Sequence, residues 1–168
     1  MELNHVQNLG HVADMILHKS PDALAIVKGS SAYPNLMGTV SFFNTSSGVL
    51  ILADFKGLPA GTGTCRGGSI FAFHIHEGGS CTGTAQDPFA NAGGHYNPGN
   101  CPHPYHAGDM QPLFGNNGTA WMAFLTDRFK VSEIIGKTVI VHASPDDFTT
   151  QPSGNAGAKI ACGVIEAI

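Results

Sequence analysis

From residue 23 onwards, apolar and polar residues alternate with a period of two, which is typical of β-strands with one buried face. Stretches rich in Gly, Ser and Asn, such as 45–48, lie between these segments and indicate turns. The pattern predicts strands over residues 23–28, 36–44, 49–58, 69–76, 119–126, 137–143 and 159–165. At least seven short strands predict an all-β fold, an antiparallel Greek-key β-sandwich or flattened barrel.

Three segments depart from this pattern. Residues 77–117 and 144–158 are longer than strand connections require, and long loops of this kind are usually functional. Residues 1–22 have apolar residues at roughly helical spacing up to Ser20-Pro21, which predicts a short amphipathic helix or a loose arm. We therefore expect an N-terminal extension over 1–22 and a single domain over 23–168.

Composition agrees with a loop-rich β protein. Among the 168 residues, 22 are Gly and 10 are Pro, and only 12% are charged. The net charge of −4 and the lack of any Lys or Arg cluster argue against nucleic acid as a partner. The longest apolar runs are only as long as strands, so the sequence gives no support to a membrane role.

The N-terminus and the cysteines favour different compartments. Residues 1–5 lack the basic and apolar regions of a secretory signal, which predicts a cytoplasmic protein for the sequence as written. Four cysteines, an even number with three pairings, suit an exporting context better. An extracytoplasmic location is thus the alternative, if the sequence is a mature or trimmed form.

Histidines are the candidate chemistry of the chain. His74 and His76 lie two apart in a predicted strand, so both side chains leave the same face, about 6 to 7 Å apart. His95, His103, His106 and Asp109 follow at spacings of eight, three and three, and offer a four-ligand set suited to zinc. His142 ends a later strand and can converge with His74, His76 and His95, and four imidazoles suit copper. His5, His11 and His18, which have no acid or cysteine nearby to complete a site, are interpreted as solvated.

These residues stand in motifs that resemble the copper/zinc superoxide dismutase family, in its bacterial-type form. The matching segments are FHIHE at 73–77, GGHYNP at 93–98, HAGD at 106–109, VH at 141–142 with DD at 146–147, and GNAGAKIACGVI at 154–165. They occur in order over roughly 23–168. The architecture of that family is the β-sandwich that the strand count predicts.

The resemblance implies two metal sites and a redox reaction. Copper would be held by His74, His76, His95 and His142, and zinc by His95, His103, His106 and Asp109. The implied enzyme is an oxidoreductase that converts superoxide to O2 and hydrogen peroxide by cycling Cu(II) and Cu(I), with His95 as metal bridge and proton relay. Asp146 resembles an aspartate that accepts the free N–H groups of His74 and His103; the alternative is an exposed loop acid after Pro145.

The resemblance also implies an intrasubunit disulfide between Cys81 and Cys162. Cys65 and Cys101 are additional, and we predict a second bridge between them; the alternative is two free thiols.

Two departures from the family stand out. His106 follows His103 by only three positions, so the zinc segment looks short. Lys159 occupies the place where the family usually has an arginine that docks the anionic substrate, so we expect an active enzyme that handles small anions less well. The 144–158 loop contains no Lys or Arg, and Thr149, Thr150 and Gln151 are predicted to organise water at the channel rim.

Other functions on the same fold are alternatives. The main one is a non-enzymatic copper binder or carrier, which loss of a ligand would favour; the other is a structural module with vestigial sites. All seven ligand positions are filled, which favours the enzyme. The family forms homodimers through different surfaces and also monomers, so a homodimer is a candidate assembly.

Overall fold

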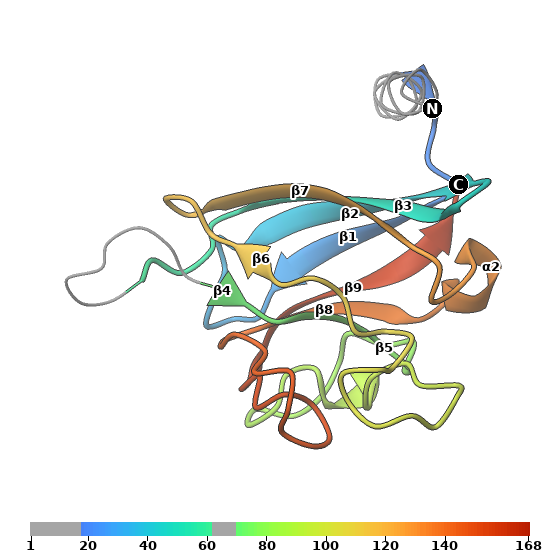
Figure 1. Ribbon diagram of the computed structural model, residues 1–168. Coiled ribbons are helices and arrows are strands. Elements are labelled where there is room, and N and C mark those ends of the chain that lie inside the picture. The colour runs from blue at the N-terminus through green and yellow to red at the C-terminus, as the bar shows by residue number, and fades with distance from the viewer. Residues whose placement is uncertain (1–17, 62–69) are drawn as a thin grey trace.

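A computed structural model describes residues 18–61 and 70–168, and its centre is one antiparallel sheet of seven strands. The strands lie in the order β5-β8-β9-β1-β2-β3-β7. The sheet curls, so that β8 and β9 face β2, β3 and β7 across the interior (Figure 1). Its strands are β1 (Ala23–Gly29), β2 (Met37–Thr45), β3 (Gly48–Lys56), β5 (Phe73–His76), β7 (Thr119–Thr126), β8 (Thr138–His142) and β9 (Lys159–Ala167).

The fold class predicted from the sequence is confirmed. The first and last strands, β1 and β9, are neighbours, and β3 pairs with β7 across a long excursion, so the connections are of the Greek-key kind. The predicted turn at 45–48 closes the β2–β3 hairpin, where Thr45 pairs with Gly48. Gly48 has φ +128°, a conformation that glycine adopts without strain.

The prediction of one continuous strand over 69–76 is wrong, because the segment divides at Ala72 into two strands. β4 (Ile70–Phe71) pairs with β6 (Leu113–Phe114), a strand that the sequence did not predict, whereas β5 pairs with β8. Between them, the Ala72 N–H donates to Ser144 O at 2.8 Å and Ala72 O accepts from His142 N–H at 2.9 Å. Ala72 thus ties the start of β5 to the end of β8.

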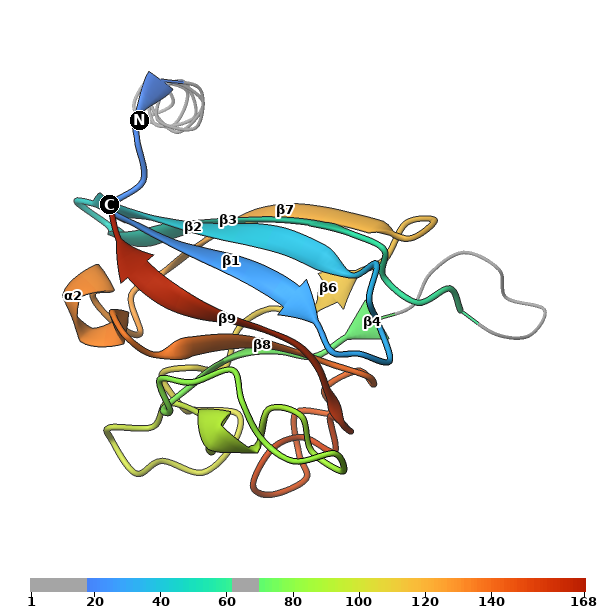
Figure 2. The same ribbon diagram turned by 180° about the vertical axis from the view of Figure 1, so that it is seen from behind.

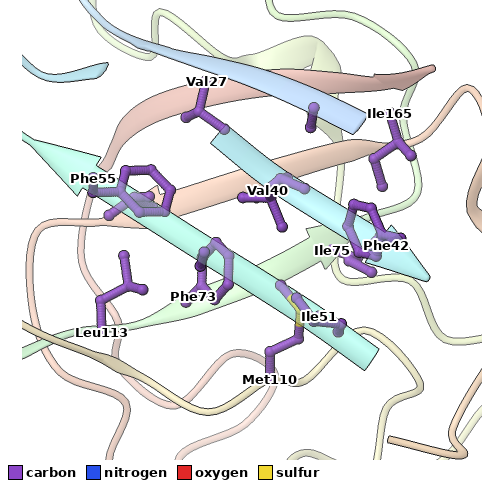
Figure 3. Packing of buried hydrophobic residues seen from close by; sticks show 14 of the residues in the cluster. Val27, Val40, Phe42, Ile51, Phe55, Phe73, Ile75, Met110, Leu113 and Ile165 are labelled. Atoms are coloured by element: carbon purple, nitrogen blue, oxygen red, sulfur yellow. The ribbon is translucent and has the colours of Figure 1, made fainter. Parts of the chain in front are cut away.

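The main core lies inside the curled sheet. Figure 3 shows Val40 of β2, Phe55 of β3, and Phe73 and Ile75 of β5 gathered there, and all four are buried. The Phe55 and Phe73 rings meet edge to face with centroids 5.8 Å apart. Since side chains alternate along a strand, the inward placement of Phe73 and Ile75 turns His74 and His76 to the opposite face of β5.

The long loops gather on that opposite face. The segments between β5 and β6 and between β8 and β9 lie together beyond β5 and β8, on the side away from β2, β3 and β7 (Figures 1 and 2). They contain one short helix, η1 (Ala90–Ala92), while α2 (Val131–Ile134) lies between β7 and β8. The two segments predicted to be functional therefore meet in space.

A disulfide between Cys81 and Cys162 joins the first loop to β9, as expected. Its 81-residue separation gives about 4 to 5 kcal/mol of stabilisation in the chain-entropy picture. Cys101 is exposed and is a free cysteine in the structure, and Cys65 lies outside the described residues. Because Cys65 is not among the described residues, the Cys65–Cys101 bridge and its alternative of two free thiols stay predictions.

The N-terminal prediction falls mostly on residues 1–17, which lie outside the described residues, so the division into 1–22 and 23–168 stays a prediction. β1 does begin at Ala23. Within the described ranges, no helix has the length and apolar character needed to cross a membrane.

Candidate metal centre

β5 and the end of β8 supply three of the candidate ligands. β5 pairs with β8 so that His74 lies opposite Ile140, and His142 follows two positions later on β8. His74, His76 and His142 are all buried. Two adjacent strands thus present three imidazoles on the face that the loops cover.

The first loop runs along the free edge of β5. The Tyr96 N–H donates to Ile75 O at 2.8 Å, and Gly108 O accepts from the Ile75 N–H at 2.9 Å. Two isolated antiparallel β-bridges pair the backbone of His76 with that of His95 and the backbone of His74 with that of Asp109. Backbone hydrogen bonds to β5 therefore bring the loop ligands beside the strand ligands.

One cluster consists of imidazoles only. Its ligand atoms lie within 4.8 Å of one another and come from His74, His76, His95 and His142. The His76 ring donates through Nδ1 to Gly93 O at 2.9 Å, and the His142 ring through Nδ1 to Gly157 O at 3.2 Å. Their Nε2 atoms then carry lone pairs and face each other at 3.2 Å. Such a contact is repulsive without a cation, so this cluster fits a metal ion.

Burial keeps three of these rings, those of His74, His76 and His142, uncharged. Desolvation, together with the neighbouring His142, holds the pKa of His76 well below its ordinary value. Desolvation, together with His74, lowers the pKa of His142 to about 3, and desolvation also lowers the pKa of His74. Neutral imidazole is the form that binds metals, so the rings are ready as ligands at neutral pH.

The second cluster adds a carboxylate. Its ligand atoms also lie within 4.8 Å of one another and come from His95, His103, His106 and Asp109. The Asp109 carboxylate lies 2.7 Å from His95 Nδ1, 3.1 Å from His103 Nδ1 and 3.4 Å from His106 Nδ1. Three imidazoles and one carboxylate are a donor set for zinc. His95 belongs to both clusters. Its Nδ1 faces Asp109 of the second cluster, and its Nε2 is buried and has no hydrogen-bond partner.

Asp146 connects the two clusters, because its carboxylate contacts one histidine of each. Its carboxylate accepts from His74 Nε2 at 2.7 Å and from His103 Nε2 at 2.9 Å. The Nδ1 atoms of these two rings are left buried and without hydrogen-bond partners, as ligand atoms would be. Burial opposes ionisation of Asp146, but the hydrogen bonds from His74, the Phe148 N–H and His103 hold its pKa well below the usual range. One charged carboxylate thus fixes the tautomer of one histidine in each cluster.

Lys159 lies beside the all-imidazole cluster. A bulge between Val141 and His142 places Lys159 opposite His142 in the β8–β9 pair. A cavity of about 690 Å³ is lined by His76, His95, His142 and Lys159. Lys159 Nζ, however, donates to Asp87 Oδ2 at 2.7 Å, and this ion pair lowers the pKa of Asp87. Asp87 lies 72 residues from its partner along the chain, and no sequence motif marks it as part of the site.

Sequence reasoning also missed Arg128. Its Nη1 lies within hydrogen-bond distance of the carbonyl oxygens of Pro104, His106 and Asp109, at 3.1, 3.3 and 3.1 Å. These carbonyls belong to the segment that carries three of the four ligands of the second cluster. A lone arginine before a short helix offers no sequence signal for this contact.

The role of Thr149, Thr150 and Gln151 in ordering water stays a prediction, but the structure gives all three side chains partners within the protein. The hydroxyls of both threonines donate to Asp147, at 3.2 and 2.6 Å. The Gln151 amide accepts from the His103 N–H at 2.9 Å and donates to His103 O at 2.7 Å. These side chains therefore hold the loop together and join it to a ligand residue.

Comparison with known proteins agrees with this geometry. The family model described as copper/zinc superoxide dismutase (SODC) matches residues 36–165. The chain is 34% identical over 145 residues to copper-zinc superoxide dismutase 2 of Aquifex aeolicus, covering 77% of this chain and 79% of that protein. It is 33% identical over 149 residues to the enzyme of Deinococcus radiodurans, with 78% of each chain covered. For the enzyme of Escherichia coli K12, the identity is 35% over 144 residues, with 77% and 79% covered. Strands, paired ligand clusters and sequence relatives agree, and the chain belongs to the copper/zinc superoxide dismutase family.

Proposed function

We propose that this oxidoreductase converts two superoxide anions and two protons to O2 and hydrogen peroxide, with His95 joining its two metal sites. The copper ligands are His74, His76, His95 and His142. The zinc ligands are His95, His103, His106 and Asp109. The observation that carries the proposal is that one ring, His95, belongs to both four-ligand clusters.

When bound, copper would supply the electron transfer by cycling between Cu(II) and Cu(I), and zinc would supply a second positive charge. The protein provides protons, position and access. His95 Nε2 is buried, lacks any hydrogen-bond partner in the structure, and belongs to a ring that lines the cavity. This nitrogen would hold copper when the metal is bound, and it is the atom at which the ring would take up a proton and pass it to a product anion in the cavity. Asp109, whose Oδ1 lies 2.7 Å from His95 Nδ1, holds the ring from the other side meanwhile.

Lys159 is the residue that receives the anion. The chain carries a net charge of −4, so the attraction of superoxide depends on local positive charge. Lys159 lines the same cavity as His76, His95 and His142, and no other lysine or arginine of the described residues lines it. An ammonium ion binds a small anion as a point charge and lacks the two parallel donors of a guanidinium. Lys159→Arg is therefore expected to raise kcat/KM and to tighten inhibition by azide.

Pulse radiolysis tests the activity directly. Purified protein loaded with one equivalent each of copper and zinc is expected to accelerate the decay of superoxide in proportion to its concentration, with little change across neutral pH. If copper is bound at the all-imidazole cluster but the decay follows the uncatalysed rate, the chain is a copper binder or carrier. Failure of a normally folded chain to bind copper would indicate a structural module.

Assembly and location are separate predictions. A homodimer is expected to sediment at twice the mass of the 17.5 kDa chain at micromolar concentration. Fractionation of the source cells decides between the cytoplasmic location and the extracytoplasmic alternative.

A further inference from the structure

We propose that Asp87 is a specificity-determining residue of the anion site, because it holds Lys159 in an ion pair and limits the charge that a small anion meets. The inference rests on the proposed function, in which Lys159 receives the anion. Lys159 Nζ lies 2.7 Å from Asp87 Oδ2, and their side chains are 17% and 43% exposed. Both residues line the cavity that contains His76, His95 and His142.

The position of Asp87 is fixed by its own turn. The Asp87 N–H donates to Thr84 Oγ1 at 3.1 Å, and Asp87 O accepts from the N–H groups of Thr84 and Ala90 at 2.9 and 3.1 Å. Asp87 Oδ1 accepts from the Phe89 N–H at 3.2 Å. One carboxylate oxygen is thus used within the turn, and the other is directed to Lys159.

The turn that contains Asp87 is itself attached to β9, the strand that begins at Lys159. The Cys81–Cys162 disulfide crosses from the loop to this strand. Phe89 and Ala92 are buried against Ile140 and Cys162 in a small apolar cluster. Loop and strand therefore keep the carboxylate and the ammonium in register, and the pair does not depend on two freely moving surface side chains.

An anion in the cavity competes with Asp87 for the same ammonium. The carboxylate offsets part of the positive charge of Lys159, and an incoming anion has to share or displace it. Half-exposed ion pairs are weak, so removing the competitor is expected to strengthen anion binding by about two- to fivefold. Asp87 is thus expected to weaken anion binding further, in addition to the weakening expected from a lysine at position 159 in place of an arginine.

Azide titration of the copper- and zinc-loaded protein, followed by visible absorption, is the test. Asp87→Asn keeps an oxygen for the Phe89 N–H and removes the charge. It is expected to lower the azide Kd about two- to fivefold. Asp54→Asn is the matched control, since it makes the same change of net charge on an exposed residue of β3 that does not line the cavity, and it is expected to leave the Kd unchanged.

A double-mutant cycle separates a direct competition for Lys159 from a general loss of negative charge. In a Lys159→Met background, Asp87→Asn is expected to have no effect on the azide Kd. The metal-free protein gives a second readout, because reductive methylation of Lys159, followed by mass spectrometry, is expected to be faster in Asp87→Asn than in Asp54→Asn.

The outcomes separate this inference from the proposed function. An azide Kd that is unchanged or raised in Asp87→Asn, while Lys159→Met weakens azide binding, overturns the role of Asp87 and leaves that of Lys159. If Lys159→Met also leaves the Kd unchanged, the proposed role of Lys159 fails, and this inference fails with it.

Discussion

Gly154 lies directly against the Asp146 carboxylate. A Cβ at Gly154 would collide with Asp146 Oδ1 and would lie 2.7 Å from His103 Nε2. Gly154 also has φ +67°, where side chains are strained. The missing side chain leaves the space that the hydrogen bond between Asp146 and His103 occupies. The position is therefore tied to the metal clusters although Gly154 carries no ligand.

Gly154→Ala is expected to lower the free energy of unfolding of the metal-free protein by about 2 to 4 kcal/mol, because it adds a collision to the strain of positive φ. Urea unfolding measures the loss. Gly136→Ala is the matched control: Gly136 has φ +78° and no atom within 4 Å of an added Cβ. This control is expected to lose only about 1 to 2 kcal/mol. Equal losses in the two variants would contradict a specific role of the space beside Asp146.

Asp146→Asn is expected to weaken binding of both metals, each by about 10- to 100-fold. An asparagine oxygen accepts from one ring, whereas the carboxylate accepts from both His74 and His103. Competition with a coloured chelator gives the two affinities. Asp147→Asn makes the same charge change one residue along, where the carboxylate accepts from Thr149 and Thr150 and touches no histidine. Loss of affinity for one metal only would show that Asp146 does not couple the two sites.

The ligand clusters could be predicted because their signals are local. His74 and His76 alternate with Phe73 and Ile75, and the loop ligands follow at short spacing. The break at Ala72 could not be predicted, since residues 70–75 form one run of strand-forming residues. Only the pairing partners show the break, with β6 on one side and β8 on the other. The pattern of residues along the chain does not indicate which strands will pair.

The contacts that support the site were missed for the same reason. Arg128 reaches carbonyl oxygens 19 to 24 residues away, and Gln151 reaches His103 from 48 residues away. Lys159 was singled out from its motif, but its ion pair with Asp87 depends on how the disulfide-linked loop folds onto β9. Residue type predicted which side chains form the two four-ligand clusters. The tertiary fold decides what holds those side chains in place.

Arg128→Met is expected to weaken zinc binding about tenfold and to leave copper binding nearly unchanged. The guanidinium contacts carbonyl oxygens of Pro104, His106 and Asp109, whose segment supplies ligands only to the second cluster, the proposed zinc site. Zinc and copper competition assays on the same preparation measure both effects. Lys56→Met, on the exposed end of β3, removes the same charge and is expected to change neither affinity. Equal weakening of both metals by Arg128→Met would indicate a general loss of stability.

The pH dependence of the metal-free protein follows from its buried histidines. Burial lowers the pKa of His142 to about 3 and holds the pKa of His76 well below its ordinary value, whereas an unfolded chain takes up protons near pH 6.5. As the pH falls below about 6.5, the unfolded state binds protons that the folded state does not bind, so the folded state loses stability. The folded pKa of Asp146 is also lowered, but its stabilising effect is lost only below about pH 4, where unfolded carboxylates protonate.

The window between pH 6 and pH 5 therefore isolates the histidines. His76 and His142 alone are expected to reduce the free energy of unfolding by about 2 kcal/mol across it, and His74, whose pKa burial also lowers, adds to this loss. Urea unfolding of the metal-free protein at both pH values gives the difference. His142→Gln removes one of these rings and is expected to reduce that difference by about 1 kcal/mol. A free energy of unfolding that stays level between pH 6 and pH 5 would mean that the rings take up protons in the folded state. The lone pairs of His76 and His142 would then not be available to a metal ion in this range.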